Sequence, residues 1–467
     1  MKMNRRILAA IVVVIIVIAA FVAMWQLNLF APAPSAEARN IKMGIVAGMQ
    51  TVEGQDIERA ARLAIDEINA QGGIWVEEWH TNVKIDLVLV DTVDDAAGST
   101  AGPVTRAITD QNVDILIGGA TTGGTLTGQI PAITNRVPFI ITGASLNLVT
   151  RRGSLPEGNP LRYNDTEGMS YMFHYCTTIQ DYSQTVADFL AESVKPKLDS
   201  QFTFDTARKL RLAILYRDDG YGRGVRDITS TIIQTDNLPI DIVANVSYAP
   251  TATTYQSQLI SIKDSNPDSV YIAGFTADTA EAIKEGINDV GLKSLYIAVE
   301  ICEDPQFYSL LSETGTFQIL ESKIATQWQG ETWYLPKVGT YVEDYKQKFD
   351  GKIPGMLGAD TYDAVYITKN AIERAGTLNK TKVRDAIENT NMPQSLLIME
   401  NERIAFSTGS NYHEILPKTF IEQLIWNPTP APGALKPYVV YPASMPGISS
   451  FKQADFSLPP DYEPGSP

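Results

Sequence analysis

The segments ILIGGATTGGT (residues 115–125) and VPFIITGAS (residues 137–145) are apolar runs that end in turns rich in glycine and hydroxyl side chains. Continuous apolar runs are typical of parallel strands that helices cover on both faces. In an open sheet of this kind, ligands bind at the carboxyl ends of the strands. Two neighbouring strand ends with hydroxyls and free backbone N–H groups therefore predict a site for a small anion such as a carboxylate. This pattern indicates binding rather than catalysis.

Strand and helix patterns alternate on both sides of this stretch. Residues 41–47 and 84–91 have strand patterns, and residues 54–71 between them have helical spacing. The apolar side chains at that spacing are Ile57, Ala61, Ala64, Ile65 and Ile68. Glycines at the end of NAQGG (residues 69–73) predict the helix stop, because glycine tolerates the left-handed cap conformation.

A second series of the same kind begins near residue 171. Its strand patterns cover residues 210–216, 240–246, 269–275 and 294–300. Later segments predict helices over 338–350, 358–375 and 382–389 and strands over 402–408, 418–426 and 437–443. From Met445 the proline-rich chain is expected to lie extended or to fray. The repeated βαβα order predicts an α/β fold with two doubly wound, parallel-sheet lobes.

Length and charge narrow the class of protein. The 467 residues suffice for two or three domains. The formal net charge of -16 argues against nucleic acid or an anionic membrane surface as the partner.

The N-terminal segment has the pattern of a membrane anchor. Three basic residues among the first six precede an apolar run over residues 7–25, which approaches the length that spans a bilayer. The basic residues place the N-terminus in the cytoplasm and the rest of the chain outside it, at the cell membrane. We expect a cytoplasmic stub and a single-pass transmembrane helix over residues 1–30 and an exposed linker over residues 31–40. A cleaved signal peptide is the alternative.

Cysteine and histidine give no sign of a metal site. The chain has two cysteines, Cys176 and Cys302, which outside the cytoplasm can either form a disulfide or remain free, buried thiols. Its three histidines are scattered, and no pair has the spacing of metal ligands.

Several segments together resemble the extracytoplasmic solute-binding proteins of ABC importers, in the leucine/isoleucine/valine-binding family with the type I periplasmic binding fold. The resemblance covers about residues 41–445, and the order and spacing of its segments are more specific than any one of them. The matching segments are residues 41–48, 54–74, 87–95, 113–124, 137–145, 215–224, 267–275 and 360–376.

The resemblance implies two lobes joined by a hinge, which close on a ligand between them. The implied first lobe comprises residues 41–173 and 328–402, the second comprises 174–327 and 403–445, and an extended tail covers 446–467.

The resemblance also implies which residues hold an amino acid. A carboxylate needs hydroxyls and N–H groups, an ammonium needs an acid, and a side chain needs an apolar wall. The implied ligand-binding residues are Thr121, Thr122 and Ser145 for the carboxylate with a carbonyl from Gly143, Glu300 for the ammonium, and Tyr221 and Phe275 for the wall.

Each of these residues also has an ordinary structural role. A threonine before a helix, such as Thr122, is an N-cap by default. An acid at a strand end, such as Glu300, is usually solvated, because burial without a partner is costly. Aromatic side chains such as Tyr221 and Phe275 more often belong to the core.

Two departures from the family pattern bear on the ligand. The loop over residues 48–54 is shorter than usual, with Glu53 where an aromatic residue is common, and His174 replaces a frequent arginine. We expect both residues near the cleft, where an extra acid would favour a cationic or amide-bearing ligand.

The sequence thus predicts a membrane-anchored, extracytoplasmic receptor that captures an amino acid, an amide or a related small molecule and delivers it to the permease of an ABC importer. The alternative is an extracellular ligand-sensing domain that works with a separate signalling subunit. Neither a cofactor nor an enzymatic activity is expected, because the sequence lacks phosphate-binding, dinucleotide-binding, nucleophile-elbow and zinc-protease motifs.

Overall fold

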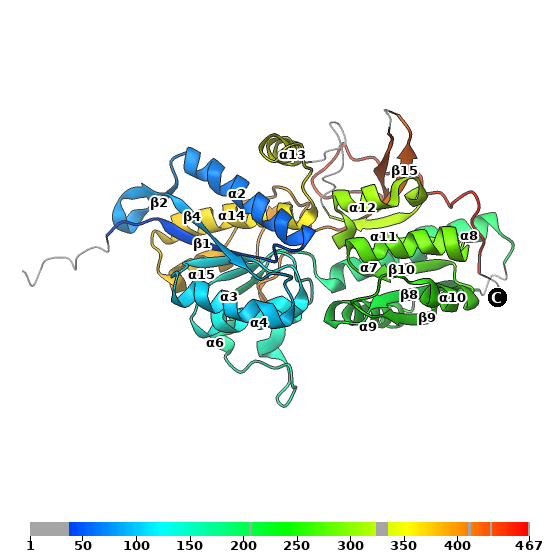
Figure 1. The fold of residues 1–467 in the computed structure, drawn as a ribbon, viewed down its shortest axis with the longest axis horizontal. Coiled ribbons are helices and arrows are strands. Elements are labelled where there is room, and N and C mark those ends of the chain that lie inside the picture. The colour runs from blue at the N-terminus through cyan, green and yellow to red at the C-terminus, as the bar shows by residue number, and fades with distance from the viewer. Residues whose placement is uncertain (1–36, 205–207, 324–334, 410–411, 430–431, 466–467) are drawn as a thin grey trace, which may run out of the picture.

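The computed structural model of the chain describes residues 37–204, 208–323, 335–409, 412–429 and 432–465. The predicted membrane anchor over residues 1–30 lies outside this part. Among the described residues, no helix is both long enough and apolar enough to cross a membrane. Figure 1 shows the chain as two α/β lobes side by side.

The first lobe is built on a five-stranded, fully parallel sheet in the order β4-β1-β5-β6-β7. Its strands are β1 (Ile41–Ala47), β4 (Ile85–Asp91), β5 (Ile115–Gly118), β6 (Phe139–Ile141) and β7 (Met172–His174). Its helices are α2 (Val52–Ala70), α3 (Ala97–Thr109), α4 (Thr122–Thr134), α5 (Leu148–Arg151), α6 (Thr166–Met169), α14 (Met356–Ala375) and α15 (Lys380–Glu388). Helix α14 comes late in the sequence but packs beside α2 (Figure 1).

Helix α2 buries the face that its periodicity predicts. Ile57, Ala61 and Ala64 are fully buried, with no exposed surface. The helix begins after Thr51, whose hydroxyl accepts a hydrogen bond from the N–H of Gly54 and caps the first turn. This cap lets the helix start two residues before the predicted position.

The second lobe is built on a seven-stranded sheet in the order β16-β15-β12-β11-β10-β8-β9. Its strands are β8 (Leu210–Arg217), β9 (Ile240–Tyr248), β10 (Ser269–Ala273), β11 (Leu295–Ala298), β12 (Ile319–Ser322), β15 (Phe420–Asn427) and β16 (Ala434–Tyr441). Its helices are α7 (Ile179–Phe189), α8 (Lys195–Gln201), α9 (Gly220–Thr235), α10 (Gln256–Asp264), α11 (Thr276–Lys284) and α12 (Pro305–Leu311).

This second sheet is mixed rather than fully parallel, which corrects the prediction. Strands β8 to β12 are parallel, whereas β15 is antiparallel to both β12 and β16. The connection between β15 and β16 is too short for the crossover that parallel strands need, so the two form a hairpin.

Short elements complete the fold. Two small antiparallel sheets pair β2 (Ile74–Val76) with β3 (Thr81–Val83) and β13 (Met392–Pro393) with β14 (Arg403–Ile404). Helix α13 (Pro336–Lys348) packs on α2. Single turns of 3-10 or π helix are η1 (Glu77–Trp79), η2 (Arg152–Ser154), η3 (Leu190–Val194), η4 (Glu285–Val290), η5 (Glu300–Cys302) and η6 (Ser312–Gly315).

Residues 403–409 and 412–415 lie against the first lobe. Glu414 forms a parallel bridge with His174 at the end of β7. Its carboxylate is 1% exposed and pairs with Arg151 of the first lobe. The predicted assignment of residues 403–445 to the second lobe is therefore corrected for this segment, because its backbone and its buried acid are bound to the first. The chain joins the second sheet at β15.

The C-terminal segment after β16 is held against the second lobe rather than frayed. Tyr462 is 7% exposed, and its hydroxyl donates to the backbone carbonyl of Asp268 at 3.1 Å. The N–H of Gly465 donates to the Asp268 carboxylate at 2.9 Å, and Arg208 pairs with the same carboxylate. The tail, described to residue 465, has no helix or strand and is fixed by this buried acid.

Candidate functional site

The turns after β5 and β6 touch each other at one edge of the first sheet. The N–H of Ala144 donates to the carbonyl of Gly119 at 3.0 Å. A Cβ atom on Gly143 would lie only 2.8 Å from the Cα of Ala120. The two strand ends singled out by the sequence are therefore neighbours, as parallel pairing requires.

Two adjacent threonines at the start of α4 differ in their contacts. The Thr121 hydroxyl accepts from the N–H of Gly124 at 3.0 Å and donates to the carbonyl of Asp95 at 2.5 Å. Thr122 is 4% exposed, and its hydroxyl has no hydrogen-bond partner among the described residues. The capping role expected of Thr122 therefore belongs to Thr121, and the Thr122 hydroxyl is available to another molecule.

Ser145 connects the second turn to the second lobe. It is 3% exposed, and its hydroxyl lies 3.3 Å from that of Tyr182 on α7. Its carbonyl accepts from the N–H of Ile179 at 3.0 Å. These bonds hold the Ser145 side chain at the boundary between the lobes.

Two aromatic rings of the second lobe face this turn pair. Tyr221 lies in the first turn of α9, and Phe275 directly precedes α11. Their ring centroids are 5.6 Å apart. The Arg217 guanidinium lies 4.7 Å from the centroid of the Phe275 ring, a cation–π contact that helps to hold this ring in place. The Tyr221 hydroxyl is buried without a hydrogen-bond partner among the described residues.

Glu300 is a buried acid, so it is not the solvated residue that its place at a strand end suggests. It opens η5 directly after Val299 and is 2% exposed. The Thr177 hydroxyl donates to Oε2, and the Lys323 ammonium lies 3.7 Å from the same oxygen. The pKa of Glu300 is raised above its ordinary value, because the effect of burial exceeds the opposing effects of the Lys323 charge and the Thr177 hydrogen bond.

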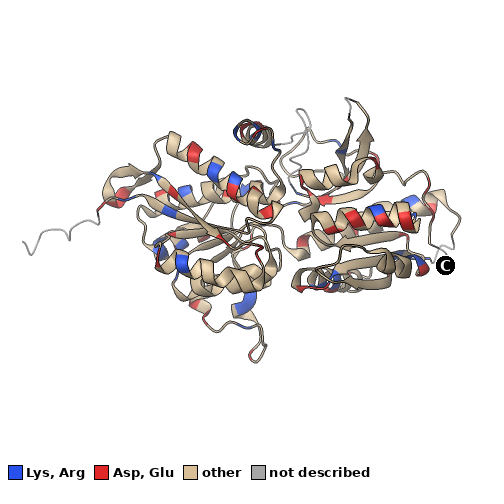
Figure 2. Ribbon diagram, in the orientation of Figure 1, with Lys and Arg blue, Asp and Glu red and all other residues tan. Residues whose placement is uncertain are grey.

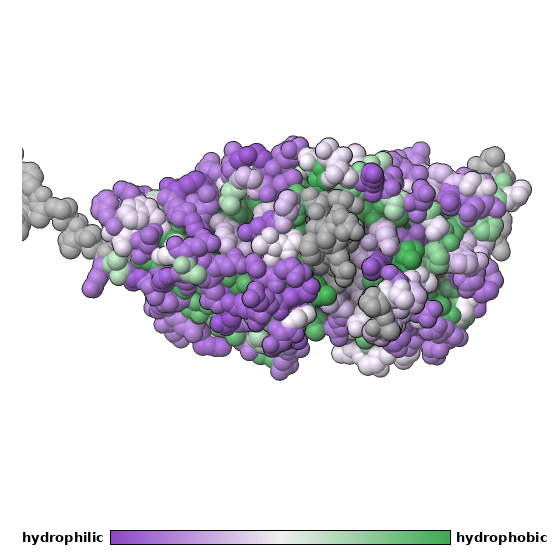
Figure 3. All heavy atoms as spheres, turned by 90° about the horizontal axis from the view of Figure 1, so that it is seen from above, coloured by the Kyte–Doolittle hydropathy of each residue, from purple (hydrophilic) through white to green (hydrophobic). Residues whose placement is uncertain are grey.

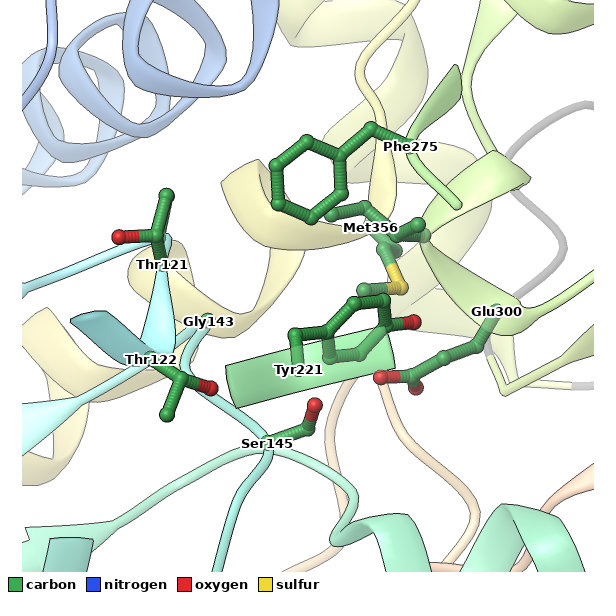
Figure 4. Close-up of a pocket in the computed structure, with 10 residues that line it drawn as sticks. Thr121, Thr122, Gly143, Ser145, Tyr221, Phe275, Glu300 and Met356 are labelled. Atoms are coloured by element: carbon green, nitrogen blue, oxygen red, sulfur yellow. The ribbon is translucent and has the colours of Figure 1, made fainter. Parts of the chain in front are cut away.

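Figure 4 shows that all the predicted site residues surround one cavity. The cavity, whose empty volume of about 270 Å³ includes space open to solvent, is lined by Ala120, Thr121, Thr122, Gly143, Ser145, Tyr221, Phe275, Glu300, Ile301 and Met356. The Thr122 and Ser145 hydroxyls point into it, whereas that of Thr121 points away (Figure 4). Figure 3 shows a mostly hydrophilic surface on both lobes, with apolar residues scattered over it and some of them near the boundary between the lobes.

The sequence did not reveal three of these lining residues. Ala120 and Ile301 adjoin predicted site residues, so adjacency could have found them. Met356 opens α14, which the sequence expected to begin at residue 358. Its N–H donates to the carbonyl of Glu303 at 3.3 Å, so this part of the wall depends on a contact between the lobes.

The profile of the periplasmic binding protein family matches residues 41–409. The chain belongs to this family. The Leu/Ile/Val-binding protein homolog 7 of Brucella suis biovar 1 (strain 1330) is 26% identical over 375 residues, which are 78% of this chain and 83% of that protein. The resemblance inferred from the sequence is therefore confirmed.

Solved structures of periplasmic binding proteins share the fold. The branched-chain amino acid transporter substrate-binding protein LivJ of Streptococcus pneumoniae, solved with isoleucine, has a TM-score of 0.65 and 18% identity over 85% of this chain and 100% of that one. An ABC transporter solute-binding protein of Rhodopseudomonas palustris BisB5, solved with 3,4-dihydroxybenzoic acid, has a TM-score of 0.67 and 16% identity over 87% of this chain and 99% of that one. The expected α/β architecture of two lobes is confirmed.

The two residues that depart from the family pattern are not among the lining residues described above. The Thr276 hydroxyl donates to Glu53 at 3.5 Å, a contact between the lobes, and burial raises the pKa of Glu53 to about 7. His174 is fully buried, with Nε2 at 3.0 Å from the sulfur of Cys176. Burial lowers the pKa of His174 to about 4, so this histidine is neutral at pH 7. It is not one of the residues that line the cavity.

Cys176 and Cys302 are both free and buried, so the thiol alternative holds and the disulfide does not. Within the described residues, no group of three or more His, Cys, Asp and Glu side chains is placed to hold a metal ion. Basic and acidic residues are mixed on outer helices such as α2 and α11 (Figure 2).

Proposed function

We propose that this chain is the solute-binding receptor of an ABC-type importer and that it captures an α-amino acid, or a closely related amide, between its lobes. One observation carries the proposal. Both lobes line the same cavity. The first lobe contributes the Thr122 hydroxyl, which has no hydrogen-bond partner among the described residues, and the second contributes the buried acid Glu300. A zwitterion is the small molecule that matches such a pair of faces.

The first lobe supplies the carboxylate side in this proposal. The Thr122 hydroxyl has no partner among the described residues, and Ser145 presents its hydroxyl to the same space. Both lie at strand ends beside the N-terminus of α4, where backbone N–H groups favour an anion. The backbone of Gly143 completes this face.

The second lobe supplies the ammonium and side-chain faces. Glu300 offers the negative charge that an ammonium needs. Tyr221 and Phe275 form an aromatic wall, to which Met356 of α14 adds an adaptable apolar side chain.

The proposal also includes a membrane anchor and delivery of the ligand to an importer. The apolar run over residues 7–25 would tether the receptor as a single-pass anchor outside the cytoplasm. The names of the relatives, which include an amino-acid transporter substrate-binding protein, support delivery of the captured ligand to an importer permease. No catalytic step, cofactor or metal is part of this function.

Thermal unfolding of the purified chain with a ligand panel tests the proposal. The panel contains leucine, isoleucine, alanine and glutamine, leucinamide, urea and 3,4-dihydroxybenzoate. An amino acid at 100 times its Kd should stabilise the fold by about 2.7 kcal/mol, a clear rise in Tm. Two leucine analogues are matched controls, because 4-methylpentanoate lacks the ammonium and isopentylamine lacks the carboxylate. If no amino acid or amide raises the Tm, the proposal is wrong.

A further inference from the structure

Lys323 is a fully buried lysine next to the cavity. It directly follows β12, and none of its surface is exposed. Its ammonium lies 2.5 Å from Oδ2 of Asp360 and 3.7 Å from Oε2 of Glu300. Asp360 belongs to α14 of the first lobe, whereas Glu300 lines the cavity from the second lobe. Lys323 therefore connects a cavity acid to a partner on the other lobe.

The two distances have different consequences. At 2.5 Å the Asp360 carboxylate forms a direct, charge-assisted hydrogen bond that fixes the ammonium in place. At 3.7 Å the ammonium still attracts Glu300 but is beyond hydrogen-bond distance from it. Lys323 therefore stabilises a negative charge on Glu300 without neutralising it by direct contact. In Figure 4 the Glu300 carboxylate faces the cavity from the side opposite Thr122.

Burial acts in the opposite direction. A carboxyl group that is 2% exposed is driven toward its neutral form unless a cation or hydrogen-bond donors favour the charge. A neutral carboxyl would attract an ammonium much more weakly than a carboxylate does.

Several titratable groups among the described residues surround Glu300. They are Lys323 and Glu321 at β12, Asp360 on α14, Asp181 and Tyr182 on α7, Tyr221 on α9, Tyr271 on β10 and Cys176 before α7. Lys323 is the cation in this set, and the others are acids or neutral groups. Glu321 is fully buried, and burial raises its pKa well above the ordinary value. Among the described residues, a negative charge on Glu300 is therefore stabilised by the Thr177 hydrogen bond and by Lys323, which supplies the positive charge.

We propose that Lys323 is a positioning residue that keeps Glu300 ionised and thereby makes the cavity selective for ligands with a protonated nitrogen. This inference rests on the proposed function and deepens it. It assigns selectivity to a residue outside the cavity lining, through an ion pair that joins the lobes. Glu300 contacts the ligand directly in this proposal, whereas Lys323 acts through Glu300.

The double variant Lys323→Met/Asp360→Asn is the main test, because it removes the ion pair without leaving either charge buried alone. The probe is leucine, or the amino acid of the panel that binds most tightly, measured by titration calorimetry from pH 8.5 to pH 5.5. We expect wild-type affinity to change less than threefold over this range. The variant should lose at least tenfold on going to pH 5.5, because its Glu300 takes up a proton.

The analogue without the amino group should show no such extra loss in the variant, since it makes no use of the Glu300 charge. Lys293→Met, which removes an exposed lysine paired with Glu463, should retain the wild-type profile. If the double variant and the wild type have the same pH profile for the amino acid, the inference is wrong while the proposed function holds. If the wild type binds no amino acid, both are wrong.

A second variant tests the inference if the double variant does not fold. Asp360→Asn alone leaves Glu300 as the nearest carboxylate for the Lys323 ammonium, which should then pair with it directly. Affinity for the amino acid should fall at least fivefold more than affinity for its deaminated analogue at pH 7.5. Equal changes for the two ligands would overturn the inference.

Discussion

The two lobes contribute chemically different groups to the two faces of the cavity. The first lobe presents neutral hydroxyls and backbone on two short turns, with Thr122 and Ser145 at their ends. The second lobe presents aromatic rings and a buried acid, Glu300. A neutral hydroxyl can be left without a partner at modest cost, whereas a buried charge needs compensation inside the protein. This difference explains why Glu300 has Lys323 close by and Thr122 has no partner among the described residues.

The largest expected effect comes from removing the charge of the second face. Glu300→Gln keeps the size of the side chain but replaces a carboxylate–ammonium bond with a neutral one. Affinity for an amino acid should fall about 10- to 100-fold, corresponding to roughly 1.5–3 kcal/mol for a hydrogen bond to a charged group. Calorimetry with leucine and 4-methylpentanoate checks this, and only leucine should lose affinity.

The control for this variant is Glu313→Gln, which changes an exposed acid of the same lobe. It should leave both affinities unchanged. Equal losses for the two ligands in Glu300→Gln would remove Glu300 from the ammonium role.

The next largest effect comes from crowding the first face. In Gly143→Ala the new Cβ atom would lie 2.8 Å from the Cα of Ala120 and 3.0 Å from the carbonyl oxygen of Gly119. Because backbone must move to make room, unfolding free energy should fall by about 1–3 kcal/mol, and ligand affinity should fall with it. Denaturant unfolding and calorimetry measure the two losses.

Gly123→Ala is the matched control in the same region. A Cβ atom there would lie no closer than 3.7 Å to its nearest neighbour, and the residue is already helical. Alanine should therefore leave stability unchanged or raise it by about 0.5–1 kcal/mol. A loss of stability as large as that in Gly143→Ala would show that crowding between the two turns is not the cause of the loss in Gly143→Ala.

Asp56 on α2 offers a third comparison, because this buried acid of the first lobe is bonded to neutral donors. Its carboxylate accepts from the Tyr345 hydroxyl at 2.8 Å and from the N–H groups of Gly355 and Gly358 at 3.1 and 2.7 Å. Burial, followed by repulsion from Asp304, raises its pKa to about 7. The folded state therefore holds a proton between about pH 4 and 7 that the unfolded state releases.

Stability from this group is present at low pH and is lost as pH rises through about 7. The loss should approach roughly 1.4 kcal/mol per pH unit. Asp56→Asn should flatten the profile by this amount, since an amide can accept from the glycine N–H groups and donate to the Tyr345 hydroxyl. Denaturant unfolding from pH 4.5 to 7.5 measures the slopes, with the exposed Asp110→Asn as control. Identical slopes for Asp56→Asn and wild type would contradict the prediction.

The smallest effects separate the two adjacent threonines. Thr121→Val removes the cap of α4 and should cost about 1 kcal/mol of unfolding free energy. Thr122→Val removes a hydroxyl that has no protein partner among the described residues, so stability should not fall. Ligands with a carboxylate should bind to the Thr122→Val variant about 3- to 10-fold more weakly, because one neutral hydrogen bond is lost. The opposite pattern, with Thr122→Val unstable and binding unchanged, would make Thr122 a structural residue.

The first face of the cavity could be predicted in most of its detail. The turns after β5 and β6 follow their strands directly, so an apolar run and its ending specify both the strand and its place at the sheet edge. The sequence predicts a cap at Thr122, whereas the structure has it at Thr121, because neighbouring threonines have the same propensity. Glu300 was found through its family position, and its burial was not apparent from its place after a strand.

Other features required contacts between distant residues. Lys323 carries no signal in the sequence, because a lysine after a strand is normally exposed. His174 and Glu53 were expected near the ligand, yet the first is buried against Cys176 and the second contacts Thr276. The position of Glu414 on the first lobe depends on its bridge with His174.

The sequence by itself determined the α/β order, the two strand-end turns and membership of a binding-protein family, because these depend on local periodicity and on the chemistry of strand ends. Only the tertiary structure decided how the charges are arranged. Lys323, Asp360 and Glu300 lie on different elements and on both lobes, and they meet only when α14 packs next to the second lobe. Burial then sets the strength of their interactions, and no local pattern of residues records how deeply a charge is buried.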